Sequence, residues 1–313
     1  MFQEILKTIQ AFDTVIIHRH GRPDGDAIGS QVGMQQIIKE NFPAKQVYMV
    51  GDNPGFYGFI EGSRMDTIPD STYHGALAII LDSGSRSMIN DDRYQLAART
   101  IRFDHHIFCE KIADLEIIDT SFESCCGLIT EFAVQCDLKL NLIASKALFT
   151  GMITDSGRFR YDSTNSRTFR LASKLMEQPI DTNELYRTLY ADDFSAKLLK
   201  AKFILKIRFT ENNVAYIYTT RQELQELNVD TFTVSRGMVG TMSDTKGVDI
   251  WVNFTETEAG VLCELRSSKY NINPIAVKYG GGGHAKASGA TVADKETAMA
   301  MLADLDAMIG ENK

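Results

Sequence analysis

The first half of the sequence alternates between short apolar runs and helical patterns, and this alternation constrains the fold more than any other feature. Five apolar runs predict strands, at Thr14–His18, 46–50, Ala76–Asp82, Arg99–Asp104 and Leu115–Asp119. Helical patterns lie between or after them, at 27–42, Cys125–Cys136, Leu142–Ile153 and Arg167–Glu177. Strands that alternate with helices favour an α/β fold, with a mostly parallel sheet and helices on both faces. In such a sheet, ligands bind at the carboxyl ends of the strands.

The pattern changes in the second half of the chain. Residues 181–206 contain neither Gly nor Pro and predict helix. Further strands are predicted at 214–220, 248–256, 260–268 and 290–293, and a closing helix at Lys295–Ile309. We therefore expect a catalytic domain over 1–185, a helical connector over 186–206 and a smaller α+β domain over 207–313. The active-site cleft is expected between the two domains.

The charge and the cysteine content of the chain limit the classes of ligand it can bind and the cellular compartment in which it functions. The chain has 33 Lys and Arg against 41 Asp and Glu, a net charge of −8. Because non-specific binding of long nucleic acid needs basic patches, this balance favours small phosphate ligands held in a local pocket. The five cysteines form no CxxC pair, which favours reduced thiols over disulfides or a structural zinc site. No apolar stretch is long enough to span a bilayer, so we expect a cytoplasmic protein that binds no membrane.

The loop after the first predicted strand is crowded with polar side chains and glycine. The stretch HRHGRPDGDAIGS, residues 18–30, carries His20, Asp24 and Asp26. Its proline and three glycines favour a tight turn at the end of a strand. Taken alone, this stretch is better explained as a solvated polar turn than as a functional site.

Three later segments favour a metal site instead. Asp82 ends the run ALAIILD, and Asp155 ends an apolar helical run. The segment FDHH places Asp104, His105 and His106 at the end of the fourth predicted strand. Carboxylates that converge on one edge of a sheet repel each other by about 4 kcal/mol per close pair, unless they bind protons or cations. Aspartates and histidines without a thiolate favour manganese or a similar ion, and two such ions form a clamp for attack on phosphorus.

These segments resemble the motifs of a known family and occur in the same order along the chain. HGRPDGDAIGS, LDSGS, DHH and TDSGRF are similar to four successive motifs of the DHH phosphoesterases. The C-terminal GGGGHAKASG and ELRSS are similar to signatures of the DHH-associated domain. The resemblance covers nearly the whole chain and is strongest to the family's nanoRNase and pAp phosphatase group. Ser83 and Ser156 stand where threonine is common in the family, and we expect no loss of chemistry from that.

The resemblance implies two Mn²⁺ ions per active site, with Mg²⁺ or Co²⁺ as substitutes. It implies that one ion is held by His20 and Asp24, the other by Asp26, His105 and Asp155, and that Asp82 bridges both. Neighbouring side chains on an extended segment point to opposite sides, so we expect only one histidine of the pair to bind metal. Which one does so is left open by the sequence.

The remaining catalytic assignments concern the DHH segment. We assign His105 to the metal and His106 to the substrate phosphate or the leaving group. Asp104 is expected to orient an imidazole. Together with the bridging Asp82, His106 and Asp104 form the expected catalytic set.

The second domain is expected to hold the part of the substrate that does not react. Four consecutive glycines at 280–283 are as well explained by a plain turn, but their N–H groups could form a nest for an anion. With a metal site in the other domain, substrate binding is the favoured interpretation, for Gly281, Gly282, Gly283 and His284. Arg266 closes a predicted strand and would add a phosphate clamp, with Ser267 beside it.

The predicted function is hydrolysis of very short RNA and removal of the 3′-phosphate from 3′-phosphoadenosine 5′-phosphate (pAp), by water activated at two metal ions. A phosphodiesterase for pApA or cyclic di-AMP is the nearest alternative, and the motifs barely separate the two. A manganese pyrophosphatase is disfavoured because its lysine-rich signature is absent, and a RecJ-type exonuclease because no further nucleic-acid-binding domain is present. A non-catalytic nucleotide sensor is disfavoured because every motif position is filled. Monomer and homodimer both remain open.

Overall fold

The computed structural model describes residues 1–311, which fold into two units. The first unit is Met1–Leu189 and the second begins at Tyr190. The segment expected as one helical connector is interrupted: α6 (Thr182–Tyr190) ends before a short non-helical stretch, and α7 (Phe194–Lys206) follows. Phe203 of α7 is fully buried in a core of the second unit, so α7 is part of that unit rather than of a linker.

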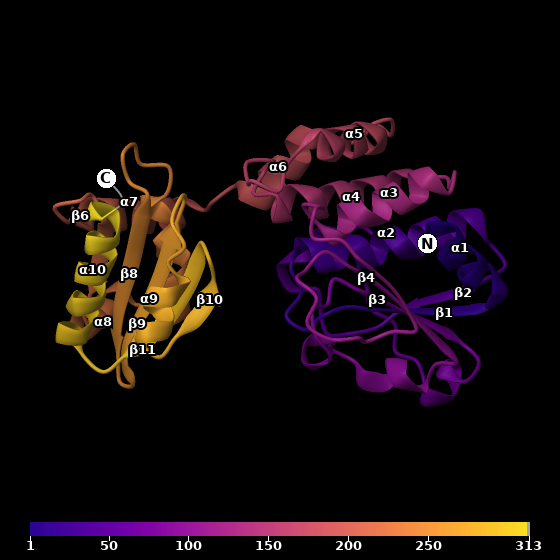
Figure 1. Ribbon diagram of the computed structural model, residues 1–313. Helices are drawn as coiled ribbons and strands as arrows, with labels where there is room; N and C mark the ends of the chain where they lie inside the picture. The colour runs from indigo at the N-terminus through magenta and orange to yellow at the C-terminus, as the bar shows by residue number, and fades with distance from the viewer. Residues whose placement is uncertain (312–313) are drawn as a thin grey trace. The chain divides into compact units, whose positions relative to one another are not determined.

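A five-stranded parallel sheet forms the centre of the first unit (Figure 1). Its strands are β1 (Thr14–His18), β2 (Gln46–Met49), β3 (Leu77–Leu81), β4 (Arg99–Asp104) and β5 (Leu115–Ile118). Their order in the sheet is β2-β1-β3-β4-β5, and every neighbouring pair is parallel. The five strands expected from the apolar runs are confirmed, so the carboxyl ends of β1, β3 and β4 lie side by side.

Long helices cover only one face of this sheet. They are α1 (Phe2–Ala11), α2 (Gly25–Asn41), α3 (Cys125–Gln135) and α4 (Leu142–Asp155), followed by α5 (Ser166–Leu175). Ile17, Ile79 and Phe103 point from the strands into this helical layer and belong to the largest core. The helical patterns read from the sequence match α2 to α5 closely.

The opposite face is covered by loops and short 3₁₀ helices. They are η1 (Gly55–Phe59), η2 (Asp70–Tyr73), η3 (Arg86–Met88) and η4 (Asp92–Leu96). Tyr73 and Tyr94 from these turns are buried in the two small cores on this side. The expectation of helices on both faces therefore holds only if 3₁₀ turns are counted. Residues 50–76 contain two prolines and five glycines, which disfavour an α-helix there.

The second unit is built on a six-stranded mixed sheet. In sheet order its strands are β10 (Gly282–His284), β11 (Ala287–Val292), β9 (Gly260–Ser267), β8 (Ile250–Thr257), β7 (Ala215–Thr219) and β6 (Arg208–Phe209). All pairs are antiparallel except β7 with β8. The other elements are α8 (Arg221–Leu227), η5 (Thr233–Gly237, a π-helix), η6 (Gly240–Met242), α9 (Asn273–Lys278) and α10 (Lys295–Gly310). The expected α+β domain is thus present. No helix in residues 1–311 is long and apolar enough to cross a membrane.

Candidate metal centre

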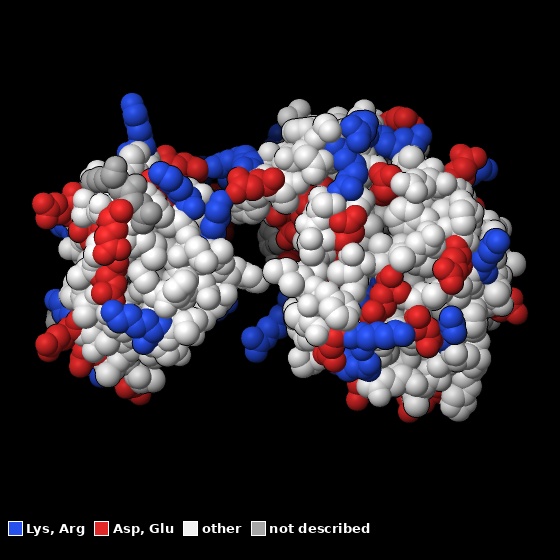
Figure 2. Space-filling model, viewed as in Figure 1, with Lys and Arg blue, Asp and Glu red and all other residues white. Residues whose placement is uncertain are grey.

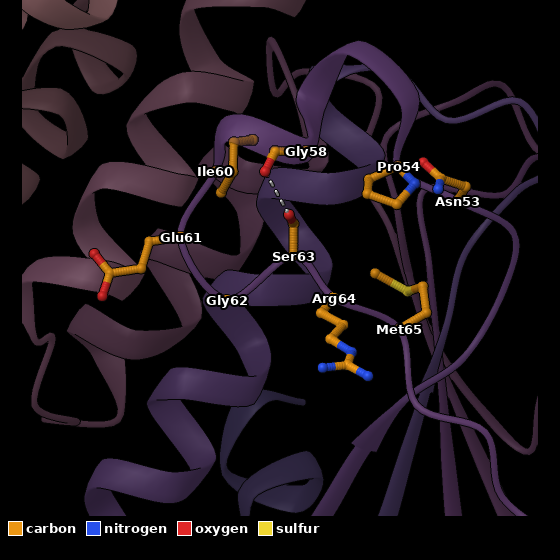
Figure 3. Close-up of a pocket in the computed structure, with 9 residues that line it drawn as sticks. All are labelled: Asn53, Pro54, Gly58, Ile60, Glu61, Gly62, Ser63, Arg64 and Met65. Atoms are coloured by element: carbon orange, nitrogen blue, oxygen red, sulfur yellow. Dashed lines mark hydrogen bonds between the residues drawn. The ribbon is translucent and has the colours of Figure 1, made fainter.

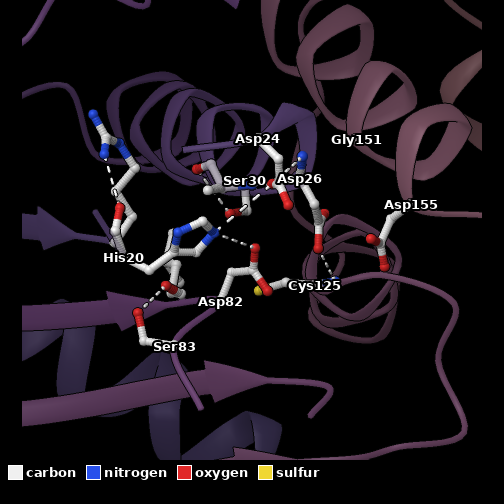
Figure 4. Close-up of polar contacts among 12 residues, drawn as sticks. His20, Asp24, Asp26, Ser30, Asp82, Ser83, Cys125, Gly151 and Asp155 are labelled. Carbon is white, nitrogen blue, oxygen red and sulfur yellow. Dashed lines mark hydrogen bonds and ion pairs between the residues drawn. The ribbon is translucent and has the colours of Figure 1, made fainter. Parts of the chain in front are cut away.

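The predicted metal ligands of the first unit lie together at the carboxyl edge of the parallel sheet. Figure 4 labels His20, Asp24, Asp26, Asp82 and Asp155 among them. His20 follows β1, Asp82 follows β3 and His105 follows β4. Asp24 and Asp26 flank the start of α2, and Asp155 is the last residue of α4. The parallel order of the strands is what brings these distant motifs to one place.

Three overlapping groups of side chains offer ligand atoms that lie within 4.8 Å of one another. The groups are His20, Asp24 and Asp82; Asp26, His105 and Asp155; and Asp82, His105 and His106. The first two groups match the two ligand sets implied by the resemblance. The assignment of one ion to each of these two groups stays a prediction.

Asp82 connects the first two groups. Its Oδ2 lies 3.4 Å from Nε2 of His20, and its Oδ1 lies 3.5 Å from Nε2 of His105. The side chain is 2 % exposed, and Oδ1 accepts no hydrogen bond from any residue in the described range. Burial opposes the charge of this carboxylate, but the imidazoles of His105 and His20 hold its pKa well below the ordinary value. A buried anionic oxygen without a donor fits a cation between these side chains.

Asp24 and Asp26 are held by backbone N–H groups at helix starts. Asp24 caps α2, and its Oδ1 accepts the N–H groups of Asp26 and Ala27, each at 3.0 Å. Asp26 is 1 % exposed and accepts the N–H of Cys125 on Oδ2 at 2.7 Å and that of Cys126 on Oδ1 at 2.9 Å. Helix N-termini favour negative charge, so α3 orients the Asp26 carboxylate. For these adjacent cysteines the sequence predicted only reduced thiols, and this role of their backbone was not anticipated.

The charges in the cluster depend strongly on one another. Burial raises the pKa of Asp26 well above its ordinary value, and the carboxylates of Asp82 and Asp155 add to this. Burial also raises the pKa of Asp155, to about 7, with Asp82 contributing. Burial works against protonation of His20 and His105, yet the nearby carboxylates raise their pKa values to about 11 and about 10. Divalent cations between such crowded carboxylates would favour their charged forms.

His106, a member of the third group, also belongs to a hydrogen-bonded chain with Asp104 and Arg102. Its Nδ1 lies 2.7 Å from Oδ1 of Asp104, and its side chain is 40 % exposed. The other carboxylate oxygen of Asp104 accepts a hydrogen bond from Arg102, whose side chain is fully buried and also donates to the carbonyl of Gly84 at 3.1 Å. Because Nδ1 faces Asp104, Nε2 is the ring nitrogen left for a ligand. The contact expected between Asp104 and an imidazole is present. The contact with Arg102 was not anticipated, although Arg102 stands two positions before Asp104 in the predicted strand RTIRFD, where both side chains point to the same face.

Tyr57 is a second residue near the site that sequence analysis missed. Its Cε1 lies 2.9 Å from the point where a side chain on Gly25 would begin. Burial raises the pKa of Tyr57, and the Asp24 carboxylate adds to this. Phe56 beside it is 61 % exposed, and the two rings meet edge to face with centroids 5.2 Å apart. The aromatic run GFYGF in a glycine-rich loop was the signal.

The loop that carries these aromatic residues also forms a pocket (Figure 3). The pocket has a volume of about 540 Å³ and is lined by Asn53, Pro54, Gly58, Ile60, Glu61, Gly62, Ser63, Arg64 and Met65. None of the predicted metal ligands lines it. The pocket is therefore distinct from the cluster around Asp82.

Most of the predicted substrate residues of the second unit lie on β9 and β10, the two strands that flank β11. In the sheet, Ala287 pairs with Arg266 on one side and with His284 on the other, so these two side chains share a row and a face. The hydroxyl of Ser267 accepts the N–H of Tyr270 at 2.7 Å and donates to the carbonyl of Asp249 at 2.9 Å. Ser267 therefore shapes the turn after β9.

The glycine run differs from the expected anion nest. The N–H groups of Gly280 and Gly281 donate to carbonyls at the end of α9, at 3.0 and 2.9 Å, so they are not free for an anion, and a nest over all four glycines is wrong. A side chain on Gly281 would begin 2.1 Å from the carbonyl oxygen of Gly289, and one on Gly283 would begin 2.6 Å from that of Ala287. Close packing of β10 on β11 thus explains glycine at 281 and 283.

The visible surface carries acidic and basic side chains interspersed (Figure 2). This agrees with the net charge of −8. Strong non-specific binding of long nucleic acid would instead need a continuous basic stripe. The interspersed charges are thus compatible with the small ligands that the sequence favoured.

Comparison with known proteins gives one consistent result. A model of the DHH family, N-terminal domain, matches residues 14–153, and a model of the DHHA1 domain matches residues 214–311. The bifunctional oligoribonuclease and PAP phosphatase NrnA of Bacillus subtilis is 33% identical, over 100% of both chains. A probable bifunctional oligoribonuclease and PAP phosphatase NrnA of Streptococcus mutans is 37% identical, over 92% of this chain and 93% of the relative. The crystal structure of an exopolyphosphatase-related protein from Bacteroides fragilis has the same fold, with a TM-score of 0.84 at 24% identity, covering 99% of this chain and 97% of that one.

Proposed function

The chain belongs to the DHH family and is a hydrolase of phosphoester bonds, and we propose that it cleaves very short RNA and pAp with the help of two Mn²⁺ ions. The observation that carries the proposal is the position of Asp82. Its two oxygens face the imidazoles of His20 and His105, each of which belongs to its own group of ligands. One carboxylate shared by two such groups supports a two-ion site.

The residues present fit two divalent cations. His20 and Asp24 would hold one ion, Asp26, His105 and Asp155 the other, and Asp82 would contact both. Mixed imidazole and carboxylate ligands suit Mn²⁺ better than Mg²⁺. When bound, two such ions stabilise the charge that develops on a phosphate and make water a better nucleophile.

The chain's own residues supply orientation and contacts to the substrate. The start of α3 fixes the Asp26 carboxylate, and Asp104 fixes the imidazole of His106. We propose that Nε2 of His106 contacts the scissile phosphate or the leaving oxygen, since that nitrogen is free of Asp104. In the second unit, we propose that Arg266 and His284, with the backbone at Gly282 and Gly283, bind the part of the substrate that does not react.

The choice of substrate rests on the relatives. Both curated relatives named above are described as oligoribonuclease and PAP phosphatase, and this chain matches them over more than nine-tenths of its length. Hydrolysis of pApA or of cyclic di-AMP remains the alternative. All five cysteines are free thiols, as is usual in a reducing compartment, and the cytoplasmic location stays a prediction.

A substrate panel tests the proposal. Purified protein is incubated with Mn²⁺ and pAp, pApA, cyclic di-AMP, pyrophosphate or RNA of increasing length, and the products are separated by chromatography. We expect AMP and phosphate from pAp, and mononucleotides from the shortest RNAs with falling rates as length increases. Hydrolysis of cyclic di-AMP or pyrophosphate alone would overturn the proposed substrates, and no hydrolysis of any of them would favour a non-catalytic nucleotide sensor.

A further inference from the structure

In the second unit, one carboxylate lies between two arginines. Oε1 of Glu264 accepts a hydrogen bond from Nε of Arg236 at 3.0 Å, and Oε2 lies 3.3 Å from Nη1 of Arg266. Glu264 is 13 % exposed at its side chain, whereas Arg236 is 62 % exposed. Two guanidinium groups face a single carboxylate, so the cluster carries an excess positive charge.

Both arginines keep hydrogen-bond donors for a further ligand. A guanidinium has five N–H groups. Arg236 uses its Nε, and Arg266 uses Nη1 for Glu264 and for the carbonyl of Leu265 at 2.8 Å. The guanidinium of Arg236 also lies over the ring of Phe232, 5.7 Å from its centroid. Within residues 1–311, no hydrogen bond or ion pair occupies either terminal nitrogen of Arg236, or Nε and Nη2 of Arg266. These are the fork-shaped donors that bind phosphate oxygens in pairs.

Arg236 is presented by a turn that the core fixes in place. The residue lies in the π-helix η5, and π-helical turns occur frequently at functional sites. The buried amide of Asn253 on β8 donates to the carbonyls of Val234 and Ser235, at 2.6 and 2.8 Å. Asn253 also pairs with Glu264 across the sheet. Asn253, which holds the turn, is therefore the direct neighbour of Glu264, which lies between the two arginines. This arrangement holds Arg236 beside Arg266.

The strand next to this cluster leaves room for a ligand. On β11, Ala287 pairs with Arg266 and Gly289 pairs with Glu264. Because these two residues have little or no side chain, no large side chain of β11 fills the space beside the arginines on this face of the sheet. His284 follows on β10, opposite Ala287.

We infer that Arg236 is a further substrate-binding residue, and that with Arg266 it forms a two-arginine site for the terminal phosphate of the substrate that is not cleaved. This inference rests on the proposed function. A terminal phosphate monoester carries up to two negative charges, whereas an internal diester carries one. Since Glu264 already offsets one guanidinium, the doubly charged group competes best for the remaining donors.

Steady-state kinetics with a matched pair of dinucleotides test this inference. Arg236→Ala is compared with Arg221→Ala, which removes another exposed arginine of the same unit that lies 3.5 Å from a single carboxylate, that of Glu258. Each enzyme is assayed with Mn²⁺ on pApA, with its 5′-phosphate, and on ApA, without it. We expect Arg236→Ala to raise KM for pApA about 10-fold or more, as the loss of a hydrogen bond between charged groups implies. The kcat on pApA, the KM for ApA and the manganese content should stay unchanged, and Arg236→Lys should restore part of the affinity.

Two results would overturn the role of Arg236. One is an equal rise in KM for pApA and ApA; the other is a rise no larger than that of Arg221→Ala. If the wild-type protein hydrolyses neither dinucleotide nor pAp, the proposed function fails. The inference can then still be tested by calorimetry, by comparing how tightly the wild type and Arg236→Ala bind pAp. Weaker binding by the variant would support the role of Arg236, and equal binding would refute it.

Discussion

The carboxylate of Asp26 accepts the backbone N–H of Cys126, a residue 100 positions further along the chain, at 2.9 Å. The neighbouring N–H of Cys125 donates to the other oxygen of Asp26. A side chain on Gly151 would begin 2.2 Å from Sγ of Cys126 and 2.9 Å from Oδ1 of Asp26, so only glycine lets α4 pack this closely. The packing of three core helices therefore orients one carboxylate of the candidate metal centre.

Asp26→Asn should cost both stability and activity. The amide nitrogen of asparagine would face one of the two backbone N–H donors, and a buried donor left without an acceptor costs about 1–3 kcal/mol. The matched variant is Asp155→Asn, whose side chain is 32 % exposed and accepts no backbone N–H of residues 1–311 in a hydrogen bond. We expect both variants to lose activity, but only Asp26→Asn to lower the free energy of unfolding in urea. Equal unfolding curves for the two variants would contradict this role of α3.

Asp82→Asn should reduce the metal content of both sites. Asp82 has a left-handed backbone, with φ of +49°, and asparagine tolerates that conformation better than alanine. Because the two oxygens of Asp82 face both ligand groups, losing the charge should weaken both ions, whereas Asp24→Asn should weaken one. Elemental analysis after dialysis against Mn²⁺ measures this. Retention of both ions and near-normal turnover by Asp82→Asn would refute the bridging role.

The convergence of the six predicted metal ligands was predictable, because each lies at or soon after the end of an apolar run, and parallel strands bring such ends to one edge. Side-chain partners were harder to predict. Because Arg102 and Asp104 alternate on one strand, the sequence places their side chains on the same face. That this ion pair is fully buried, and therefore important for stability, is evident only from the fold. Tyr57 and Arg236 lie on a 3₁₀ turn and a π-turn, which have no strong periodicity. The glycines at 281 and 283 reflect strand pairing with residues 287–290, a register that only the folded chain defines.

Removing divalent ions should abolish activity and lower thermal stability. Burial raises the pKa values of Asp26 and Asp155, and the carboxylate of Asp82 adds to this, so without cations the charged forms of these two groups cost free energy in the folded state. An ion that binds only the folded state stabilises it by about 2.7 kcal/mol at about 100 times its Kd. Thermal unfolding in chelator, Mn²⁺ and Mg²⁺ should give the highest Tm with Mn²⁺, and activity should return in the same order. Full activity in excess chelator after dialysis would exclude the two-ion proposal.

His106→Ala should separate chemistry from metal binding. His106 is bonded to Asp104 and lies at the exposed side of the cluster, so its loss should leave stability and manganese content unchanged. If its Nε2 contacts the leaving oxygen, kcat should fall by about 100-fold or more. Arg102→Met is the structural counterpart: it removes the buried cation that bonds the second oxygen of Asp104 and leaves His106 as the remaining side-chain partner of this carboxylate. It should cost up to about 3–5 kcal/mol of stability. A loss of manganese from His106→Ala would assign this histidine to the metal instead.

Alanine at 281 and at 282 should distinguish packing from substrate contact in the glycine run. A methyl group on Gly281 would meet the backbone of β11, so Gly281→Ala should lower Tm and detach β10 from the sheet. A methyl group on Gly282 would meet no atom within 4 Å, and Gly282 has no left-handed φ, so the fold tolerates alanine there. Any rise in KM for pAp in Gly282→Ala, at unchanged Tm and unchanged manganese content, therefore reports a ligand that lies directly against this backbone. We expect such a rise because Gly282 lies in β10, the strand that carries His284. Wild-type kinetics of Gly282→Ala would show that the run is glycine-rich for strand packing alone, and would leave Arg266, His284 and Arg236 as the substrate contacts of this unit.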